Sequence, residues 1–211
     1  MINIKTFVFN AFQENTFLLF DETKECVIID AGCNDENEYN QVDEFIKENN
    51  LVLKSIINTH CHIDHILGNA YLINKYKVQS IAHKEDLPLI ERSKDMAAAF
   101  GFDVQEPPIP NQFVNDGDEI KFGNTVFIVK HVPGHSPGSI ALYNEAEKFV
   151  IVGDVLFAGG IGRTDLPGGD YDTLITSIKE KLFTLNSDVV AYPGHGESTT
   201  IGQEMGSNPF F

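Results

Sequence analysis

The sequence predicts an α/β fold in which two β-sheets pack together and helices cover their outer faces. Two observations lead to this prediction: strand-like segments are followed by helix-like segments, and this succession occurs twice along the chain. The 211 residues suffice for one sizeable domain or for a domain built from two related halves. We therefore expect a single domain over residues 1–211, with a proline-containing seam near residues 101–112.

The individual elements follow from side-chain type and spacing. Segments rich in β-branched or aromatic residues and bounded by turn-forming residues predict strands at 2–9, 15–20, 26–32, 51–60, 78–83, 118–123, 125–132, 139–144, 148–154 and 188–196. Apolar residues at helical spacing predict helices at 36–50, 66–73, 84–100 and 171–184. Asp64 lies just before the second of these helices, near its N-terminus, where a carboxylate is favoured.

Charge and hydropathy restrict the partners. The net charge is −16, from 31 acidic and 15 basic residues, so nucleic acid would be repelled and we expect no nucleic-acid partner. No apolar run approaches the roughly 20 residues of a membrane helix, and we expect no membrane partner. An anionic small-molecule substrate is compatible with this charge, because a bound metal ion dominates the field in its own pocket. The oligomeric state is left open.

The N-terminus and the cysteines indicate a cytoplasmic protein. The segment "MINIKTFVFN" begins as a strand and has no features of a signal peptide. Three cysteines form no paired framework, which fits reduced thiols in the cytosol. Cys61 lies within a histidine-rich segment, but alternation in an extended chain directs it away from the side shared by His60 and His62, so we do not expect it to bind metal.

The segment "NTHCHIDHILGN", residues 58–69, contains three histidines and one aspartate within six positions. His60 and His62 lie two residues apart on an extended segment, share a side and can reach one metal ion. Asp64 and His65 fall where the chain turns towards a helix, and they can face a second ion. A histidine alone is more often structural than a metal ligand, but this density of donors points to metal binding.

Three later segments each end an apolar strand with a polar residue beside glycine: "HVPGH" at His135, "FVIVGD" at Asp154 and "VVAYPGH" at His195. With the cluster they supply five histidines and two aspartates, donors that suit zinc, iron or manganese. Seven donors exceed the four of a closed structural zinc site. They suit two adjacent divalent ions that share a carboxylate and a solvent molecule.

The sequence resembles the metallo-β-lactamase superfamily, whose HxHxDH motif is met by His60, His62, Asp64 and His65. The later motifs follow in order. The resemblance implies a four-layer αββα sandwich and two divalent metal ions, with zinc expected and iron or manganese as alternatives. It implies that the first ion is bound by His60, His62 and His135. The second ion would be bound by Asp64, His65 and His195, and Asp154 would bridge the two ions. Asp30 matches a position that supports the ligands, with a turn-forming role as the alternative.

Within the superfamily, "GGIGRTDLPGGDYDTL", residues 159–174, and the closing "NPFF" resemble glyoxalase II-like hydrolases, although we expect this protein to be without the helical C-terminal domain of glyoxalase II. The resemblance implies a metal-dependent hydrolase in which a metal-bound hydroxide attacks a thioester, such as a 2-hydroxyacyl thioester. Asp64 would orient the hydroxide or carry a proton. Arg163 would bind a substrate carboxylate, or else form a salt bridge to Asp165 or Asp170.

Two alternatives remain at this stage. Persulfide dioxygenases also resemble the sequence, including the "GRTD" segment, and they would use one iron held by His60, His135 and Asp154. The second alternative is a non-catalytic metal-binding module. It is disfavoured because the sequence retains all seven ligand residues. We do not expect His83 or His131 to bind metal: His83 ends a strand and would line the pocket, and His131 would pack or hydrogen-bond locally.

Overall fold

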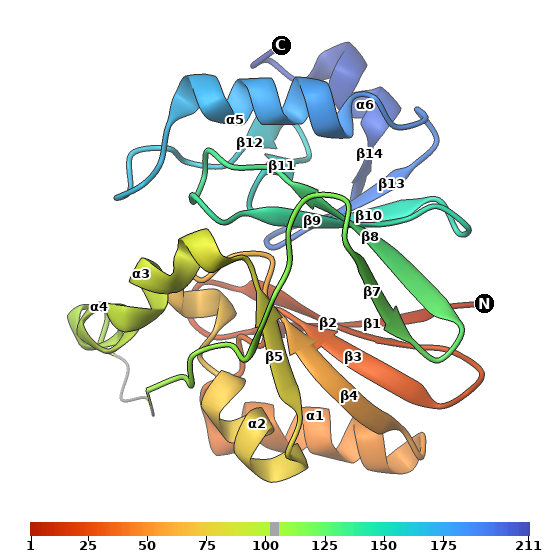
Figure 1. Cartoon of the computed structure of the whole chain (residues 1–211), viewed down its shortest axis with the longest axis vertical. Coiled ribbons are helices and arrows are strands. Elements are labelled where there is room, and N and C mark those ends of the chain that lie inside the picture. Colours follow the sequence, from red (N-terminus) through yellow and green to blue (C-terminus); the bar gives the residue numbers. More distant parts are fainter. Residues whose placement is uncertain (102–105) are drawn as a thin grey trace.

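Two six-stranded sheets face each other in the computed structural model, which describes residues 1–101 and 106–211 (Figure 1). The first sheet has strands in the order β1 (Asn3–Phe9), β2 (Glu14–Phe20), β3 (Glu25–Ile29), β4 (Val52–Ile57), β5 (Gln79–Ala82) and β6 (Gln112–Phe113). Its first three strands are antiparallel, and β3 to β6 run parallel. Parallel strands place their carboxyl ends at one edge, and loops at such an edge commonly carry functional side chains.

The second sheet has strands in the order β14 (Thr199–Thr200), β13 (Val190–Pro193), β10 (Phe149–Gly153), β9 (Ile140–Asn144), β8 (Thr125–His131) and β7 (Glu119–Phe122). A small separate hairpin joins β11 (Leu156–Phe157) to β12 (Gly160–Ile161). The chain leaves the first sheet after β6 and enters the second at β7. Residues 102–105 of the predicted seam lie outside the described residues, so the seam and the single-domain division stay predictions.

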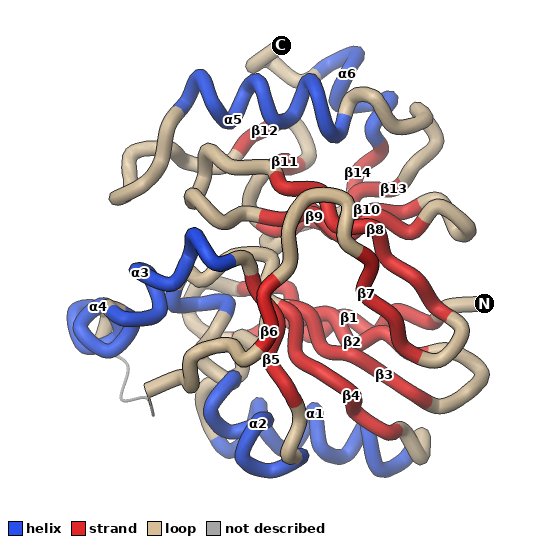
Figure 2. The backbone as a smooth tube through the Cα atoms, viewed as in Figure 1, coloured by secondary structure: helices blue, strands red, loops and turns tan. Residues whose placement is uncertain are grey.

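Helices cover the outer faces of both sheets (Figures 1 and 2). Those against the first sheet are α1 (Glu36–Glu48) and α2 (Asn69–Tyr76). Those against the second are α5 (Tyr171–Ser177), which continues into a π-helical turn (Ile178–Leu182), and α6 (Ile201–Ser207). Two further helices, α3 (Leu87–Glu91) and α4 (Ser93–Ala99), project beside the ends of the strands. The predicted four-layer αββα sandwich is thereby confirmed.

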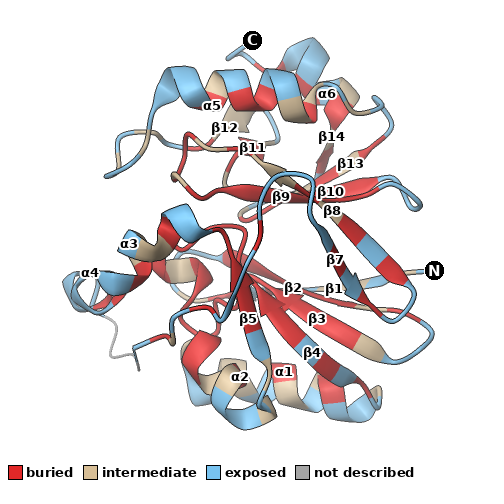
Figure 3. Ribbon diagram, in the orientation of Figure 1, coloured by how far each residue is buried: buried red, intermediate tan, exposed pale blue. Residues whose placement is uncertain are grey.

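Buried residues lie along the three interfaces between the layers (Figure 3), and apolar side chains form a cluster at each of them. Between the sheets, Phe17 and Ile57 of the first sheet belong to the same buried cluster as Phe127 and Leu142 of the second. Separate buried clusters lie beneath α1 and α2 and beneath α5 and α6. Full burial of one such side chain contributes roughly 1.5–3 kcal/mol. These interfaces hold the two sheets rigidly enough to position loops that come from both.

The segment predicted as one helix over 84–100 is interrupted. It forms a 3₁₀ turn (Lys84–Asp86), then α3, then α4. Pro88 explains the first interruption, because proline lacks an N–H and is favoured in the first turn of a new helix, where the structure places it. The second interruption, at Arg92, has no comparable signal in the sequence.

Asp21 joins the turn after β2 to the β7–β8 hairpin of the other sheet. Its carboxylate accepts hydrogen bonds from the Thr23 hydroxyl at 2.5 Å, the Asn124 N–H at 2.7 Å and the Thr125 hydroxyl at 3.0 Å. Burial raises the pKa of this carboxyl, but these hydrogen bonds outweigh burial and lower the pKa overall. Asp21 therefore stabilises the fold above the unfolded pKa, and this stabilisation is lost as the pH falls through the folded pKa.

We expect Asp21→Asn to lower the free energy of unfolding by roughly 1.5–3 kcal/mol at pH 7. The difference from the wild type is expected to shrink as the pH falls below about 4. Urea unfolding at pH 7 and pH 3 measures both quantities. A difference that is equal at the two pH values would show that the charged form of Asp21 contributes no stability.

Candidate metal centre

The predicted ligands come together at one edge of the sandwich, in loops that follow strands of both sheets. His60, His62, Asp64 and His65 follow β4, and Asp64 and His65 lie in a 3₁₀ turn, η1 (Ile63–His65). From the second sheet, His135 follows β8, Asp154 follows β10 and His195 follows β13. Because β10 and β13 are parallel neighbours, their carboxyl ends bring Asp154 and His195 to the same edge.

Three imidazoles form the first donor set. The Nε2 atom of His135 lies 3.2 Å from Nε2 of His60 and 2.9 Å from Nδ1 of His62. On its other side, Nδ1 of His135 donates to the Arg163 carbonyl at 2.8 Å, which leaves a lone pair on Nε2 when the ring is neutral. The donor atoms of all three rings lie within 4.8 Å of one another and could hold a metal ion.

His65, His195 and Asp64 form the second donor set. Asp64 Oδ2 lies 3.2 Å from Nε2 of His195 and 3.6 Å from Nε2 of His65. Each ring is oriented from behind, since Nδ1 of His65 donates to Asp30 at 3.1 Å and Nδ1 of His195 donates to the Phe12 carbonyl at 3.1 Å. Both Nε2 atoms are thereby left as donors to a metal, the arrangement expected when a second hydrogen bond fixes the tautomer.

Asp154 lies between the two sets. Its Oδ2 atom is 3.7 Å from Nε2 of His135 and 3.5 Å from Nε2 of His195, and its Oδ1 atom is 3.5 Å from Nε2 of His65. Within the described residues, His65 Nε2 and Asp154 Oδ1 are buried without a hydrogen-bond partner. Buried polar atoms nearly always have a hydrogen-bond partner or another polar ligand. Two such atoms that face each other without a partner are therefore consistent with a metal ion bound by both.

Glycine makes this close approach possible. A Cβ on Gly194 would lie 2.3 Å from Asp154 Oδ1 and 2.6 Å from His65 Cε1, so any side chain at this position would push into the donor atoms. The glycine beside His195 therefore leaves space for the site.

The two donor sets differ in charge. Burial lowers the pKa of His62 to about 3, aided by the nearby His135, and burial also lowers the pKa values of His60 and His135. For His65 and His195 burial acts in the same direction, but Asp64 and Asp154 outweigh it and raise both pKa values, that of His195 to about 10. At pH 7 the metal-free protein thus has neutral imidazoles in the first set and protonated imidazoles in the second.

Metal loading is therefore expected to release protons. At pH 7, Zn²⁺ binding to the metal-free protein should displace about two protons, from His65 and His195, besides any from bound water. Because their pKa values are raised, the release should fall and the affinity should rise as the pH increases towards 10. Calorimetry in two buffers of different ionisation enthalpy counts the protons. In His195→Asn the number should fall by about one, and an unchanged number would contradict the assignment.

Asp30 supports the second donor set directly. The residue is fully buried and has a positive φ of 53°, a conformation that Asp tolerates better than most residues. Its Oδ1 accepts from the Thr59 N–H at 2.7 Å, and its Oδ2 accepts from the Thr59 hydroxyl at 2.6 Å and from His65. Asp30 therefore forms the turn after β3 and orients His65, so the two roles considered from the sequence are combined.

Three further residues around the site were not predicted. Glu14 is buried with Oε1 3.9 Å from Nδ1 of His65, and burial raises the pKa of its carboxyl well above the usual range. The Asn15 amide donates to the carbonyls of Pro193 and Gly196, on either side of His195. Asp86 accepts from the backbone of Cys61 and Gly138, joining the loops of the first donor set. Nothing near these positions in the sequence indicates such contacts.

The remaining candidates lie at or outside the rim. Arg163 forms two 2.7 Å hydrogen bonds to Asp165, the salt bridge considered as an alternative to substrate binding. Cys61 belongs to none of the metal-capable groups found among the described residues. His83 and His131 stack with their centroids 4.0 Å apart and planes 17° apart. Together with Glu85 they form a group whose donor atoms lie within 4.8 Å of one another. Nε2 of His131 already lies 2.9 Å from the Pro137 carbonyl, and we do not assign this group to the metal centre.

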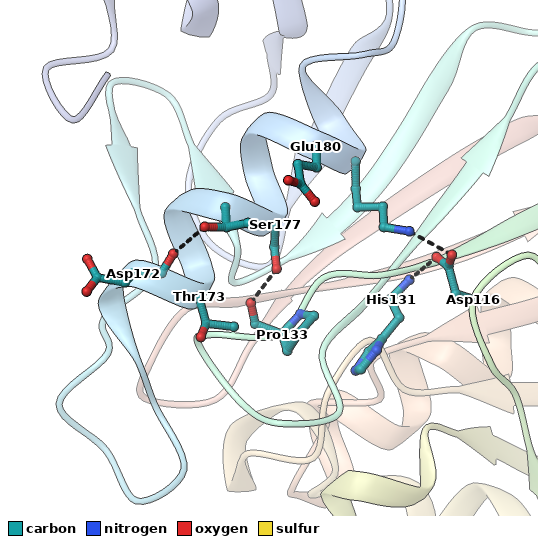
Figure 4. Close-up of a pocket in the computed structure, with 9 residues that line it drawn as sticks. Asp116, His131, Pro133, Asp172, Thr173, Ser177 and Glu180 are labelled. Atoms are coloured by element: carbon teal, nitrogen blue, oxygen red, sulfur yellow. Dashed lines mark hydrogen bonds and ion pairs between the residues drawn. The ribbon is translucent and has the colours of Figure 1, made fainter.

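A cavity of about 230 Å³ leads to the donor sets. His62, Asp64, His135, Asp154 and His195 line it together with apolar residues and Arg163. A larger cavity of about 460 Å³ lies elsewhere, under α5 (Figure 4). There Lys181 pairs with Asp116 and the Ser177 hydroxyl donates to Pro133, so these polar groups are already satisfied. The 230 Å³ cavity, which reaches the two donor sets, is the candidate active site.

The fold and the site are those of a known class of protein. Residues 9–195 match the metallo-beta-lactamase superfamily, and the chain belongs to this superfamily. It is 40% identical to hydroxyacylglutathione hydrolase GloC of Haemophilus influenzae, over 99% of this chain and 98% of that protein. These relationships indicate a metal-binding hydrolase.

Two solved structures have the same fold over nearly their whole length. BLEG-1 B3 metallo-beta-lactamase superposes with a TM-score of 0.90 at 32% identity, covering 100% of this chain and 99% of that one. TTHA1623 in a di-iron-bound form superposes with a TM-score of 0.88 at 36% identity, covering 98% and 100%. None of the described helices is long and apolar enough to cross a membrane.

Proposed function

We propose that the protein is a cytoplasmic thioesterase that uses two divalent metal ions to hydrolyse a small 2-hydroxyacyl thioester. The observation that carries this proposal is the placement of Asp154 between two sets of three donors, each set within reach of one ion. The 40% identity to a hydroxyacylglutathione hydrolase supports the choice of substrate class, and the di-iron form of TTHA1623 supports two ions.

We assign the first ion to His60, His62 and His135, the second to Asp64, His65 and His195, and a bridging role to Asp154. Zinc is the ion we expect, with iron or manganese as alternatives, because imidazole and carboxylate suit all three. When bound, two such ions supply a hydroxide at neutral pH and polarise a carbonyl oxygen. His60, His65 and His135 are buried, and burial strengthens these electrostatic effects.

Asp64 is the proposed catalytic carboxylate. It faces the cavity and is only partly buried. Burial raises the pKa of its carboxyl, but His65 and His195 outweigh burial and lower the pKa, so Asp64 is ionised at neutral pH. It can therefore accept a proton from, and orient, a water held at the centre. The departing thiolate is a good leaving group and needs no strong general acid.

Arg163 is the proposed substrate-binding cation. It lines the cavity, and its guanidinium is exposed while bound to Asp165. Exposed ion pairs of this kind contribute little stability, so a substrate carboxylate can replace Asp165 at small cost. The bidentate geometry already present is the one that a substrate carboxylate would use.

A second candidate is an iron-dependent persulfide dioxygenase. Its 2-His-1-carboxylate site would use His60, His135 and Asp154, and these three do lie together, with His135 Nε2 3.2 Å from His60 Nε2 and 3.7 Å from Asp154 Oδ2. The donor residues alone do not separate this candidate from the hydrolase. The number and kind of bound ions do.

Elemental analysis of protein purified without chelator or added metal is the deciding experiment. Two ions per chain, as zinc or as a mixture of zinc, iron and manganese, would support the hydrolase. One iron per chain and no other metal would overturn it and direct assays to persulfide and oxygen consumption. Activity is then measured on lactoyl thioesters, a persulfide and a β-lactam, the last because of the similarity to BLEG-1. An intact metal centre that cleaves none of these would identify a non-catalytic metal-binding module.

A further inference from the structure

A small second cavity adjoins the metal centre. It has a volume of about 70 Å³ and is bounded by Leu89 of α3, Met96 of α4 and Leu166. His62, Ile63, Met96 and Leu166 line both this cavity and the 230 Å³ active-site cavity, so the two are neighbouring compartments. Its lining is mainly apolar; besides the His62 imidazole and the Cys61 thiol, it includes one cation and one hydroxyl.

The hydroxyl belongs to Ser93, the first residue of α4. Ser93 is 1% exposed, and its Oγ has no hydrogen-bond partner among residues 1–101 and 106–211. A buried hydroxyl without a partner is destabilising, and such groups in native proteins call for an explanation. The neighbouring Arg92 also lines the cavity, and its side chain forms no ion pair with any described residue. The chain thus keeps an unused hydrogen-bonding group beside an apolar space next to the metal ligand His62.

The outer compartment has a different character. Phe12 and Phe100 line it and meet edge to face, with their centroids 5.3 Å apart. Arg163 lies on the same rim. An aromatic and cationic mouth of this kind can hold a larger, partly polar group outside the buried centre.

We propose that the 70 Å³ cavity is the acyl pocket, in which Ser93 selects short acyl groups that carry a hydroxyl; this inference rests on the proposed thioesterase function. At about 30 Å³ per liquid water, 70 Å³ corresponds to roughly two water-sized groups. The acyl group enters this pocket beside His62, and the thiol carrier lies along Phe12 and Phe100. Longer acyl chains are excluded by Leu89 and Met96.

The test uses N-acetylcysteamine thioesters, whose common carrier isolates the acyl group. Lactoyl and propionyl thioesters differ by one hydroxyl, and butanoyl and octanoyl thioesters extend the chain. For the wild type we expect kcat/KM to fall at least about tenfold from propionyl to octanoyl, the size of penalty typical of a pocket that is too short. In Ser93→Ala the ratio of kcat/KM for lactoyl to that for propionyl should fall about tenfold, the effect of one lost hydrogen bond.

Two further variants sharpen the result. Leu89→Ala widens the pocket and should raise kcat/KM for octanoyl relative to propionyl. Ser207→Ala removes an exposed helix hydroxyl of α6 far from the cavity and should change neither ratio. Equal rates for all chain lengths in the wild type, or an unchanged lactoyl-to-propionyl ratio in Ser93→Ala, would overturn the assignment.

A binding measurement separates this inference from the proposed function. Calorimetry of the metal-free protein with S-(2-hydroxypropyl)-, S-propyl- and S-octyl-N-acetylcysteamine, which have no thioester to cleave, reports on the pocket alone. We expect the hydroxypropyl compound to bind tightest and to lose this preference in Ser93→Ala. If no thioester is hydrolysed but the preference is found, the proposed function fails and the pocket remains. Equal binding of the three compounds overturns the pocket whatever the activity.

Discussion

Asp154→Ala is expected to lower thioesterase kcat/KM by about 10³-fold, because the proposed metal ions provide several kcal/mol of transition-state stabilisation. The side chain lies between the two donor sets, and its removal leaves His135 and His195 without their shared carboxylate. The metal content should fall below two ions per chain at the same time. Both quantities are measured on the same preparation, by steady-state kinetics and by elemental analysis.

Asp188→Ala is the matched control for this change. Asp188 also belongs to the half of the chain that forms the second sheet, but it is exposed and forms an ion pair with Lys148. It should leave both the activity and the metal content unchanged. Full activity of Asp154→Ala with two bound ions would contradict the bridging role.

Removal of the Asp30 carboxyl is expected to weaken the binding of the second ion by about 10–100-fold, as is typical when the residue that orients a metal-binding histidine is lost. Two substitutions separate its functions. Asp30→Asn keeps an oxygen for the Thr59 N–H and tolerates the positive φ, but it removes the negative charge facing His65. Asp30→Ala removes both. Competition with a chromophoric chelator gives the affinities.

We expect Asp30→Asn to lose affinity while keeping most of the stability, and Asp30→Ala to lose both. The Thr59 N–H and the His65 Nδ1–H would be left buried without an acceptor in the alanine variant, which costs about 1–3 kcal/mol each. Unchanged affinity in Asp30→Asn would show that the carboxylate positions the turn but has no influence on the ion.

The predicted ligands converge because the fold obeys a simple rule that the sequence already displays. His60, His135, Asp154 and His195 each follow an apolar strand, and loops that follow parallel strands meet at one edge. Residue type and position after a strand therefore predict which side chains meet at this edge. The sandwich itself follows from the repeated succession of strands and helices.

The supporting residues could not be found in this way. Asn15 holds the His195 loop from 181 positions away in the chain, and Glu14 and Asp86 likewise act through contacts made only in the folded state. Their local sequences look like an ordinary strand start and an ordinary helix start. Ser93 could not be found from the sequence either, because its proposed role depends on a cavity that forms only in the folded protein.

The last helix was missed although a signal exists. Thr200 accepts a hydrogen bond from the N–H of Gln203 at the start of α6, and Thr-x-x-Gln is a recognised helix-start sequence. The two glycines in "IGQEMGS" conceal the helix, since glycine disfavours helices. Buried Glu204, which accepts from Gly159 and Thr199, stabilises it instead.

The donors of the proposed centre come from loops of both sheets, and this has a consequence for how the protein unfolds. His60 and His62 belong to the first half of the chain, whereas His135 belongs to the second. An ion held by all three is therefore a cross-link between the halves, in addition to their apolar interface and to hydrogen bonds such as those of Asp21 and Asn15. Separating the sheets then requires release of the ion, and at a free metal concentration of 1,000 times Kd the folded state gains about 4 kcal/mol. The metal supply of the cell would thus set the lifetime of the folded protein as well as its activity.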